Sequence, residues 1–194
     1  MNNLTERQRE ILDAAINIIS KKGIQNLTIK NLSKKIGFSE PAIYRHFESK
    51  MEILLAILSR FESQIHKNKV LLNSETDFPI KQLGLIFKNH FSNFSKKPAL
   101  ASVIFAEEIF QDDKRLSDKI YSIMNFHFEL ILSIVKNGQK SREIRSDIKA
   151  EQLVLIIMGP LRLIIKKWTL SNHSFNLKKE GEKLWKSINI LLSN

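Results

Sequence analysis

Apolar residues recur at helical spacing along almost the whole chain, and no run alternates between apolar and polar residues as a β-strand does. Gly23 follows the first apolar stripe directly after two lysines, which is a typical end for a helix. That stripe consists of Ile11, Ala14, Ala15, Ile18 and Ile19. The pattern predicts an all-α fold of about nine helices.

The segment from residue 28 to residue 47 predicts two short helices joined by a tight turn. Thr28 can cap the first of these helices, and Gly37 can end it. Ser39 can cap the second helix, and Pro41 suits its first turn because no partner is needed there for the missing N–H. This spacing is that of a helix-turn-helix, in which the second helix enters the major groove of DNA.

Longer helices follow. Ser49 and Glu52 form a capping box for a fourth helix, and Gly138 closes a later one. Further starts are expected at or near Pro79, Pro98, Asp113, Ala150 and Leu177. We therefore divide the chain into a helix-turn-helix domain of residues 1–48 and a larger helical domain of residues 49–194.

Charge indicates the class of partner. The 194 residues contain 31 Lys and Arg against 20 Asp and Glu, a net charge of +11, which favours nucleic acid or an anionic lipid surface as partner. Residues 101–150 are neutral overall, so the central part of the chain is not the polyanion surface. The absence of cysteine excludes disulfides, thiolate nucleophiles and iron–sulfur clusters. The sequence predicts no cofactor and no metal site.

Other classes of protein are disfavoured. The most apolar stretch, residues 153–161, is about half of the ~20 residues that a membrane span needs. The charged residues 5–10 do not suit a secretory signal, so we expect a soluble, cytoplasmic protein. A Gly-rich phosphate loop and the patterns G-x-S-x-G, H-E-x-x-H and E-x-x-H are all missing, which argues against an enzyme.

Several amino-terminal motifs resemble the DNA-binding domain of TetR-family transcriptional regulators over residues 5–60. The motifs are Ile11-Leu12-Asp13-Ala14-Ala15, Lys22-Gly23, Leu27-Thr28-Ile29, Ile36-Gly37-Phe38-Ser39, Ala42-Ile43-Tyr44-Arg45-His46-Phe47 and Ser49-Lys50. The resemblance implies a three-helix domain that binds operator DNA and a second helical domain that binds a ligand and dimerises.

The same resemblance implies roles for single residues. Thr28 and Lys30 would touch phosphates, residues 39–46 would read the groove, and Lys50 would anchor a phosphate. Glu40 departs from the pattern, because its carboxylate repels phosphates and could accept only from a cytosine amino group. The candidate DNA-binding residues are Thr28, Lys30, Ser39, Glu40, Pro41, Ala42, Tyr44, Arg45, His46 and Lys50.

Bulky aromatic residues recur on several of the longer helices, and they predict an elongated, mainly apolar cavity for a small hydrophobic or aromatic effector. His90 and His127 share these faces and could orient a carbonyl or hydroxyl group; the alternative is that they only pack in the core. The candidate lining is Phe61, Phe87, His90, Phe91, Phe94, Phe105, Met124, His127, Phe128, Met158 and Trp168.

The helix over residues 150–168 is apolar on more faces than one monomer can bury, which predicts a homodimer that pairs it and the last helix in a four-helix bundle. The candidate interface residues are Leu153, Ile157, Leu161, Ile164, Leu184, Ile188 and Leu191. We expect a repressor that binds a pseudo-palindromic operator and is released by its effector. A nucleoid-type DNA-binding module without a ligand and an all-α enzyme are the alternatives.

Overall fold

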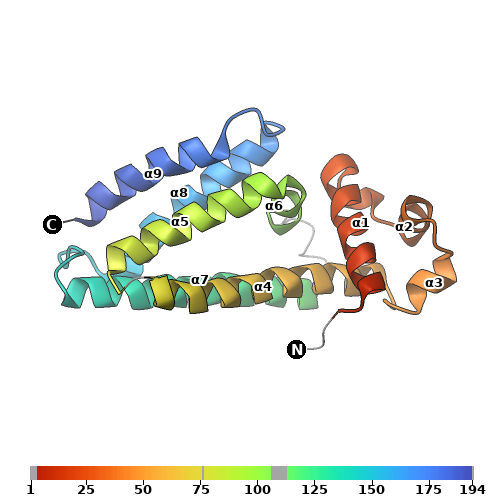
Figure 1. Cartoon of the computed structure of the whole chain (residues 1–194), viewed down its shortest axis with the longest axis horizontal. Helices are drawn as coiled ribbons and strands as arrows, with labels where there is room; N and C mark the ends of the chain where they lie inside the picture. Colours follow the sequence, from red (N-terminus) through yellow and green to blue (C-terminus); the bar gives the residue numbers. More distant parts are fainter. Residues whose placement is uncertain (1–3, 76, 106–112, 194) are drawn as a thin grey trace. The chain divides into compact units, whose positions relative to one another are not determined.

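A computed structural model describes residues 4–75, 77–105 and 113–193, with only the backbone described for residues 67–75. These residues form nine α-helices and one 3₁₀ helix, η1, and none of them lies in a β-strand (Figure 1). The elements are α1 (Glu6–Lys22), η1 (Ile24–Asn26), α2 (Ile29–Ile36), α3 (Glu40–Tyr44), α4 (Lys50–Glu75), α5 (Pro79–Lys96), α6 (Pro98–Ile104), α7 (Lys114–Lys140), α8 (Ala150–Leu170) and α9 (Leu177–Leu192). The all-α prediction is confirmed.

The chain packs as two compact units. One comprises residues 1–63 and 99–121, and the other comprises residues 64–98 and 122–194, so that α4 and α7 each contribute to both. The boundary predicted at residue 48 differs from the limits of these packing units, because it is placed between two expected functions, and it stays a prediction. Within the described ranges, no helix combines the length and the apolar character needed to cross a membrane.

The amino-terminal helices of the first unit surround a small apolar core. Leu12 of α1, Leu32 of α2 and Ile43 of α3 are fully buried, so each of the three helices contributes to it. Gly23 and Gly37 adopt positive φ angles of 78° and 74° at the ends of α1 and α2. Glycine reaches these angles without the steric penalty that a side chain brings, so both turns stay tight.

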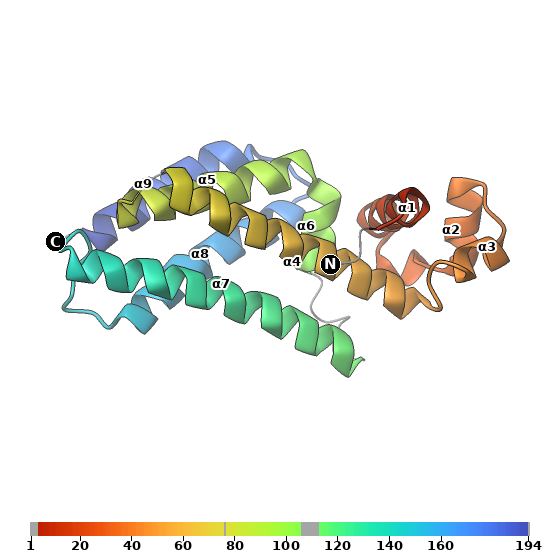
Figure 2. The ribbon, with the colours of Figure 1, turned by 60° about the horizontal axis from the view of Figure 1, so that its bottom comes forward.

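The second unit is built on α5, α8 and α9, with α9 packing along both α5 and α8. Both ribbon views show α5 and α9 side by side (Figure 2). An added Cβ at Gly84 would lie 3.1 Å from the indole of Trp185, and one at Gly181 would lie 2.2 Å from the ring of Phe91. Each helix thus presents a glycine to an aromatic side chain of the other. The two contacts run in opposite chain directions, so the helices are antiparallel.

Candidate DNA interface and ligand cavities

Local hydrogen bonds define the two short helices of the first unit. The Thr28 hydroxyl accepts from the backbone N–H of Asn31 at 3.1 Å, and the Ser39 hydroxyl accepts from that of Ala42 at 3.3 Å. Between the helices, the Ser33 hydroxyl donates to the carbonyl oxygen of Phe38 at 2.7 Å. Side chains within a few residues of each other therefore set the angle between α2 and α3, as a helix-turn-helix requires.

Helix α3 presents polar side chains over a single buried anchor. Ile43 is fully buried, whereas Tyr44 is 50% exposed and Arg45 is exposed beside it. The predicted DNA-binding residues Thr28, Lys30, Ser39, Glu40 and Pro41 are also exposed, and Ala42 and His46 are partly so. All of these side chains have surface available to contact DNA.

Lys50 differs from the other predicted contacts. Its Nζ donates to the carbonyl oxygen of Ile24 at 3.3 Å, and the residue is partly buried. The ammonium group thereby ties the start of α4 to η1, a structural role that the sequence did not reveal. Because an ammonium has three donors, two remain for a phosphate.

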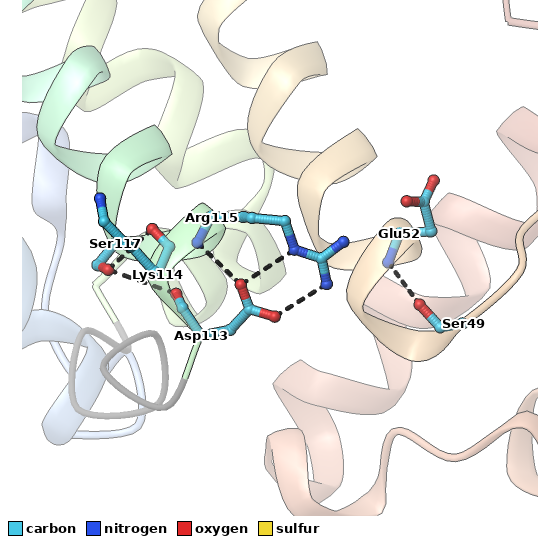
Figure 3. A network of polar contacts seen from close by, with 6 residues as sticks. All are labelled: Ser49, Glu52, Asp113, Lys114, Arg115 and Ser117. Carbon is cyan, nitrogen blue, oxygen red and sulfur yellow. Dashed lines mark hydrogen bonds and ion pairs between the residues drawn. The ribbon is translucent and has the colours of Figure 1, made fainter.

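Figure 3 shows the polar contacts at the starts of α4 and α7 in the first unit. The Ser49 hydroxyl accepts from the backbone N–H of Glu52 at 3.2 Å, which is the serine half of the predicted capping box. Nη2 of Arg115 lies 2.9 Å from a carboxylate oxygen of Asp113, and this contact lowers the pKa of Asp113. Lys119 of α7 reaches Glu62 of α4 at 2.5 Å, which holds the two helices together within this unit.

His90 and His127 meet in the second unit beside a small cavity. Their ring centroids lie 5.0 Å apart, and the cavity volume is about 30 Å³. Burial lowers the pKa of His90 to about 3, with a further contribution from His127, and burial lowers the pKa of His127 to about 4. Both rings are therefore neutral at pH 7, and the cavity has room for a water molecule rather than an effector.

A larger cavity lies along α5 and α9. It measures about 690 Å³, a size typical of small-molecule sites. One wall is apolar, and lysines from both helices border it. The lining residues are Ile80, Lys81, Gly84, Leu85, Phe87, Lys88, Phe91, Ser92, Lys178, Gly181, Glu182 and Trp185. We call this feature the α5–α9 groove.

Family comparisons agree with this architecture. Residues 11–57 match the family model of bacterial regulatory proteins, tetR family, and residues 47–191 match that of the YsiA-like protein, C-terminal region. The second match alone spans more than half of the chain. The chain belongs to the TetR family. The sequence prediction of a ligand-responsive, DNA-binding transcriptional regulator is thereby confirmed at the level of the family.

Relatives with curated names resemble this TetR-family chain over most of its length. It is 22% identical over 177 residues to the fatty acid metabolism regulator protein of Bacillus subtilis (strain 168), covering 91% of both chains. It is 25% identical over 189 residues to the nucleoid occlusion factor SlmA of Glaesserella parasuis serovar 5 (strain SH0165), covering 96% of this chain and 92% of that one.

Solved structures show the same fold. The transcriptional regulator FadR from Bacillus subtilis, in complex with stearoyl-CoA, superposes with a TM-score of 0.83 at 21% identity. The superposition covers 95% of this chain and 98% of FadR. The TetR-family fold therefore extends over both packing units.

The two cavities formed by described residues of this TetR-family chain contain only some of the predicted effector residues, and which residues contact an effector stays a prediction. Phe87 and Phe91 line the α5–α9 groove, whereas His90 and His127 line the small cavity. Phe61 and Phe105 belong to the first unit, and the other candidates lie elsewhere in the second. Of these others, Phe94 and Trp168 are buried, Phe128 and Met158 are partly exposed, and Met124 is 41% exposed.

Helical spacing alone placed Met124 on an inner face, but its surroundings put it near the surface, where its sulfur accepts from Nη1 of Arg162 at 3.5 Å. Trp168 packs in the core and donates from its indole N–H to the carbonyl oxygen of Phe175 at 2.9 Å. Sequence reasoning missed the groove residues Lys81, Lys88 and Trp185. The glycines opposite the two aromatic rings were the only available signal for them.

The predicted dimer residues also fall into two classes. Four of them are buried within the single chain, with at most 8% of each residue exposed: Leu153, Ile157, Leu161 and Ile188. Ile164 and Leu184 are partly exposed, and Leu191 is exposed. The interface stays a prediction; the apolar residues that remain exposed on α8 and α9 are Leu155, Ile156, Leu163, Leu170, Ile190 and Leu191.

Proposed function

We propose that this chain is a homodimeric transcriptional repressor that reads a pseudo-palindromic operator and leaves it on binding a long-chain acyl-CoA. The exposed face of α3 is the observation that carries the proposal. Tyr44 and Arg45 project from a helix that buried Ile43 and the Ser39 cap hold in place. Such a helix can enter the major groove without rearranging the fold.

The exposed apolar residues of α8 supply the dimer surface. Leu155, Gly159 and Leu163 recur every fourth residue and share one face of the helix, and an added Cβ at Gly159 would meet no described atom within 4 Å. A glycine between two leucines allows a second helix to approach closely. Because each chain carries one reading helix, a two-fold dimer would read two half-sites.

The class of effector rests on the relatives. One is named a fatty acid metabolism regulator, and another carries the name FadR and was solved with stearoyl-CoA. The α5–α9 groove combines an apolar surface with lysines, which suits a ligand with an apolar chain and anionic groups. Binding of the effector would change the separation of the two α3 helices in the dimer. The helices would then no longer match the spacing of the two half-sites, and the DNA would be released. No catalytic step forms part of this proposal.

Selection from random DNA, followed by titration with stearoyl-CoA, tests the regulator. We expect the selected sequences to share an inverted repeat, and micromolar stearoyl-CoA to release them. Equal affinity for selected and random DNA would instead support a nucleoid-type module, a role suggested by the similarity to the nucleoid occlusion factor SlmA.

Sedimentation tests the dimer. Leu163, which is 68% exposed, should be essential, so Leu163→Glu should give monomers that bind the operator at least about tenfold more weakly. Met124→Glu places the same charge on an exposed apolar residue of α7 and serves as the control. Sedimentation of the wild-type chain as a monomer at micromolar concentration would contradict the proposal.

A further inference from the structure

The α5–α9 groove combines an apolar surface with unpaired positive charge. Its accessible apolar surface consists of the partly exposed Ile80, Leu85 and Trp185, which lie over buried Phe87 and Phe91. Lys81, Lys88 and Lys178 border it against the single acidic residue Glu182. We infer that this groove is the binding site for the acyl-CoA, with its phosphates on the lysines and its apolar portion on this apolar surface. This assignment rests on the proposed function for the class of ligand, and on the structure for the place.

The two glycines make the groove possible. Trp185 lies against Gly84, and Phe91 lies against Gly181, so the aromatic rings sit between the helices instead of forcing them apart. Phe87 completes this packed cluster, with its ring centroid 5.1 Å from that of Trp185 and 6.0 Å from that of Phe91. Because Phe87 and Phe91 are only 1% and 2% exposed, they support the groove from below. The partly exposed side chains of Ile80, Leu85 and Trp185 give the apolar surface that an alkyl chain can cover.

The lysines are available for an anionic ligand. Among the described residues, no carboxylate lies within ion-pair distance of Lys81, Lys88 or Lys178, and all three are exposed. The Lys81 ammonium lies 4.5 Å from the centroid of the Phe78 ring, a contact that leaves its donors unused. With three ammonium groups against Glu182, the rim of the groove carries a net positive charge that attracts phosphates.

The positions of the lysines fit an elongated ligand. Lys81 and Lys88 are seven residues apart on one face of α5, and Lys178 lies in the first turn of α9. Since α5 and α9 are antiparallel, Lys178 lies toward the carboxyl end of α5, near Ser92. The charges therefore extend about 16 Å along α5, at 1.5 Å of helix rise per residue from position 81 to position 92.

Size separates this groove from the other cavity described in the second unit. The cavity beside His90 and His127 measures about 30 Å³ and the groove about 690 Å³. A water molecule fits the first, whereas a long alkyl chain with a nucleotide head needs a volume of the second order. The two histidines, neutral at pH 7, also offer no charge to a phosphate.

Tryptophan fluorescence tests the site directly. The chain has two tryptophans, so Trp168→Phe leaves Trp185 as the only one. In this variant, without DNA, stearoyl-CoA should change the emission of Trp185 in a saturable way. The complementary Trp185→Phe variant should report no change from buried Trp168. No change in Trp185 emission at stearoyl-CoA concentrations that release the operator would overturn the assignment.

Lysine variants test the contacts. Lys88→Ala combined with Lys178→Ala should weaken the binding of stearoyl-CoA about tenfold or more, because two ammonium–phosphate contacts are lost. Lys186→Ala removes an exposed lysine of α9 that does not line the groove, and it should bind like the parent. Equal affinity in the double variant and the control would overturn the role of the lysines.

Parallel titrations with stearate and with CoA identify what the groove recognises. We expect each to bind more weakly than stearoyl-CoA, and CoA to lose its binding in the lysine variants. Equal binding of stearate and stearoyl-CoA would overturn the phosphate contacts. If Trp185 responds as expected but the operator is not released, the groove assignment stands and the proposed effector role fails. If stearoyl-CoA releases the operator equally well from the parent and from the lysine double variant, the effector role stands and the groove assignment fails.

Discussion

The helix-turn-helix of α2 and α3 and the α5–α9 groove are built on different principles. In the first region, caps at Thr28 and Ser39 act within three residues, and the surface that faces outward is polar. In the second region, residues about a hundred positions apart in the sequence meet through Gly84 and Gly181. The difference means that local changes should alter the first region gradually, whereas a single methyl group can disrupt the second.

The largest expected effect comes from adding that methyl group. Gly181→Ala would place a Cβ 2.2 Å from the Phe91 ring, and we expect it to lower the free energy of unfolding by about 2 to 3 kcal/mol, because the packed ring has to move. Urea unfolding would measure the loss.

Gly159→Ala is the matched control, with both alanine variants made in the monomeric Leu163→Glu background because Gly159 lies on the proposed dimer surface. Gly159 also lies in a helix, but within the single chain an added Cβ there meets nothing within 4 Å, so this variant should gain about 0.5 to 1 kcal/mol from better helix propensity. If both alanine variants were equally stable, the close packing of α5 and α9 would be wrong.

The second effect concerns the reading helix. Tyr44→Ala should weaken operator binding by about 1 to 2 kcal/mol while leaving the unfolding free energy almost unchanged, because half of this side chain is exposed. Fluorescence anisotropy at several salt concentrations would measure both the affinity and its salt dependence.

Lys50→Ala should differ from Tyr44→Ala in its effect on stability. Since Lys50 also bonds to the Ile24 carbonyl, this variant should lose stability as well as affinity. Operator binding by both variants at the wild-type level would remove α3 and its neighbour from the interface.

The helix-turn-helix of α2 and α3 could be predicted because the interactions that define it join residues close together in the sequence. Caps at Thr28, Ser39 and Ser49 and the positive φ of Gly37 follow from the chemistry of adjacent residues, and the structure contains each of them. The amphipathic pattern likewise located the long helices. Which of these residues touch DNA stays a prediction.

The groove and the dimer surface could not be predicted in the same way. Periodicity shows that a helix has an apolar face, but not which neighbour covers it. Ile157 and Leu163 look equivalent in the sequence, yet the first is buried and the second is 68% exposed, because α9 covers one side of α8. Lys88 lines the groove together with Trp185, which lies almost a hundred residues further along the chain, and no local pattern around Lys88 indicates this pairing.

Acidification should lower the stability of the second unit. His90 and His127 stay neutral in the folded chain down to pH values near their pKa values of about 3 and about 4, whereas both protonate near pH 6.5 when unfolded. Their contribution to stability is therefore complete above pH 6.5 and is lost as the pH falls toward 4. None of the other residues that line their cavity is charged, so nothing there compensates.

Between pH 7 and pH 5.5, protonation of each histidine in the unfolded chain should lower the free energy of unfolding by at most about 1 kcal/mol. The effect is limited because both histidines are partly exposed to water in the folded chain. His127→Asn should reduce this pH dependence by about half. The same slope in the variant and the parent would show that other groups cause it.

The smallest effect expected is the loss of one cap. Ser39→Ala removes the hydroxyl that accepts from the Ala42 N–H, and it should lower the free energy of unfolding by about 0.5 to 1 kcal/mol. Because α3 has only five residues, part of the loss should reappear as weaker operator binding, whereas stearoyl-CoA binding in the groove should not change. Ser39→Thr keeps a hydroxyl at the cap and should behave like the wild-type chain in all three measurements. A Ser39→Ala variant that weakened stearoyl-CoA binding as much as operator binding would show that the reading helix and the groove are not independent, and the contrast between a locally built and a distantly built region would fail.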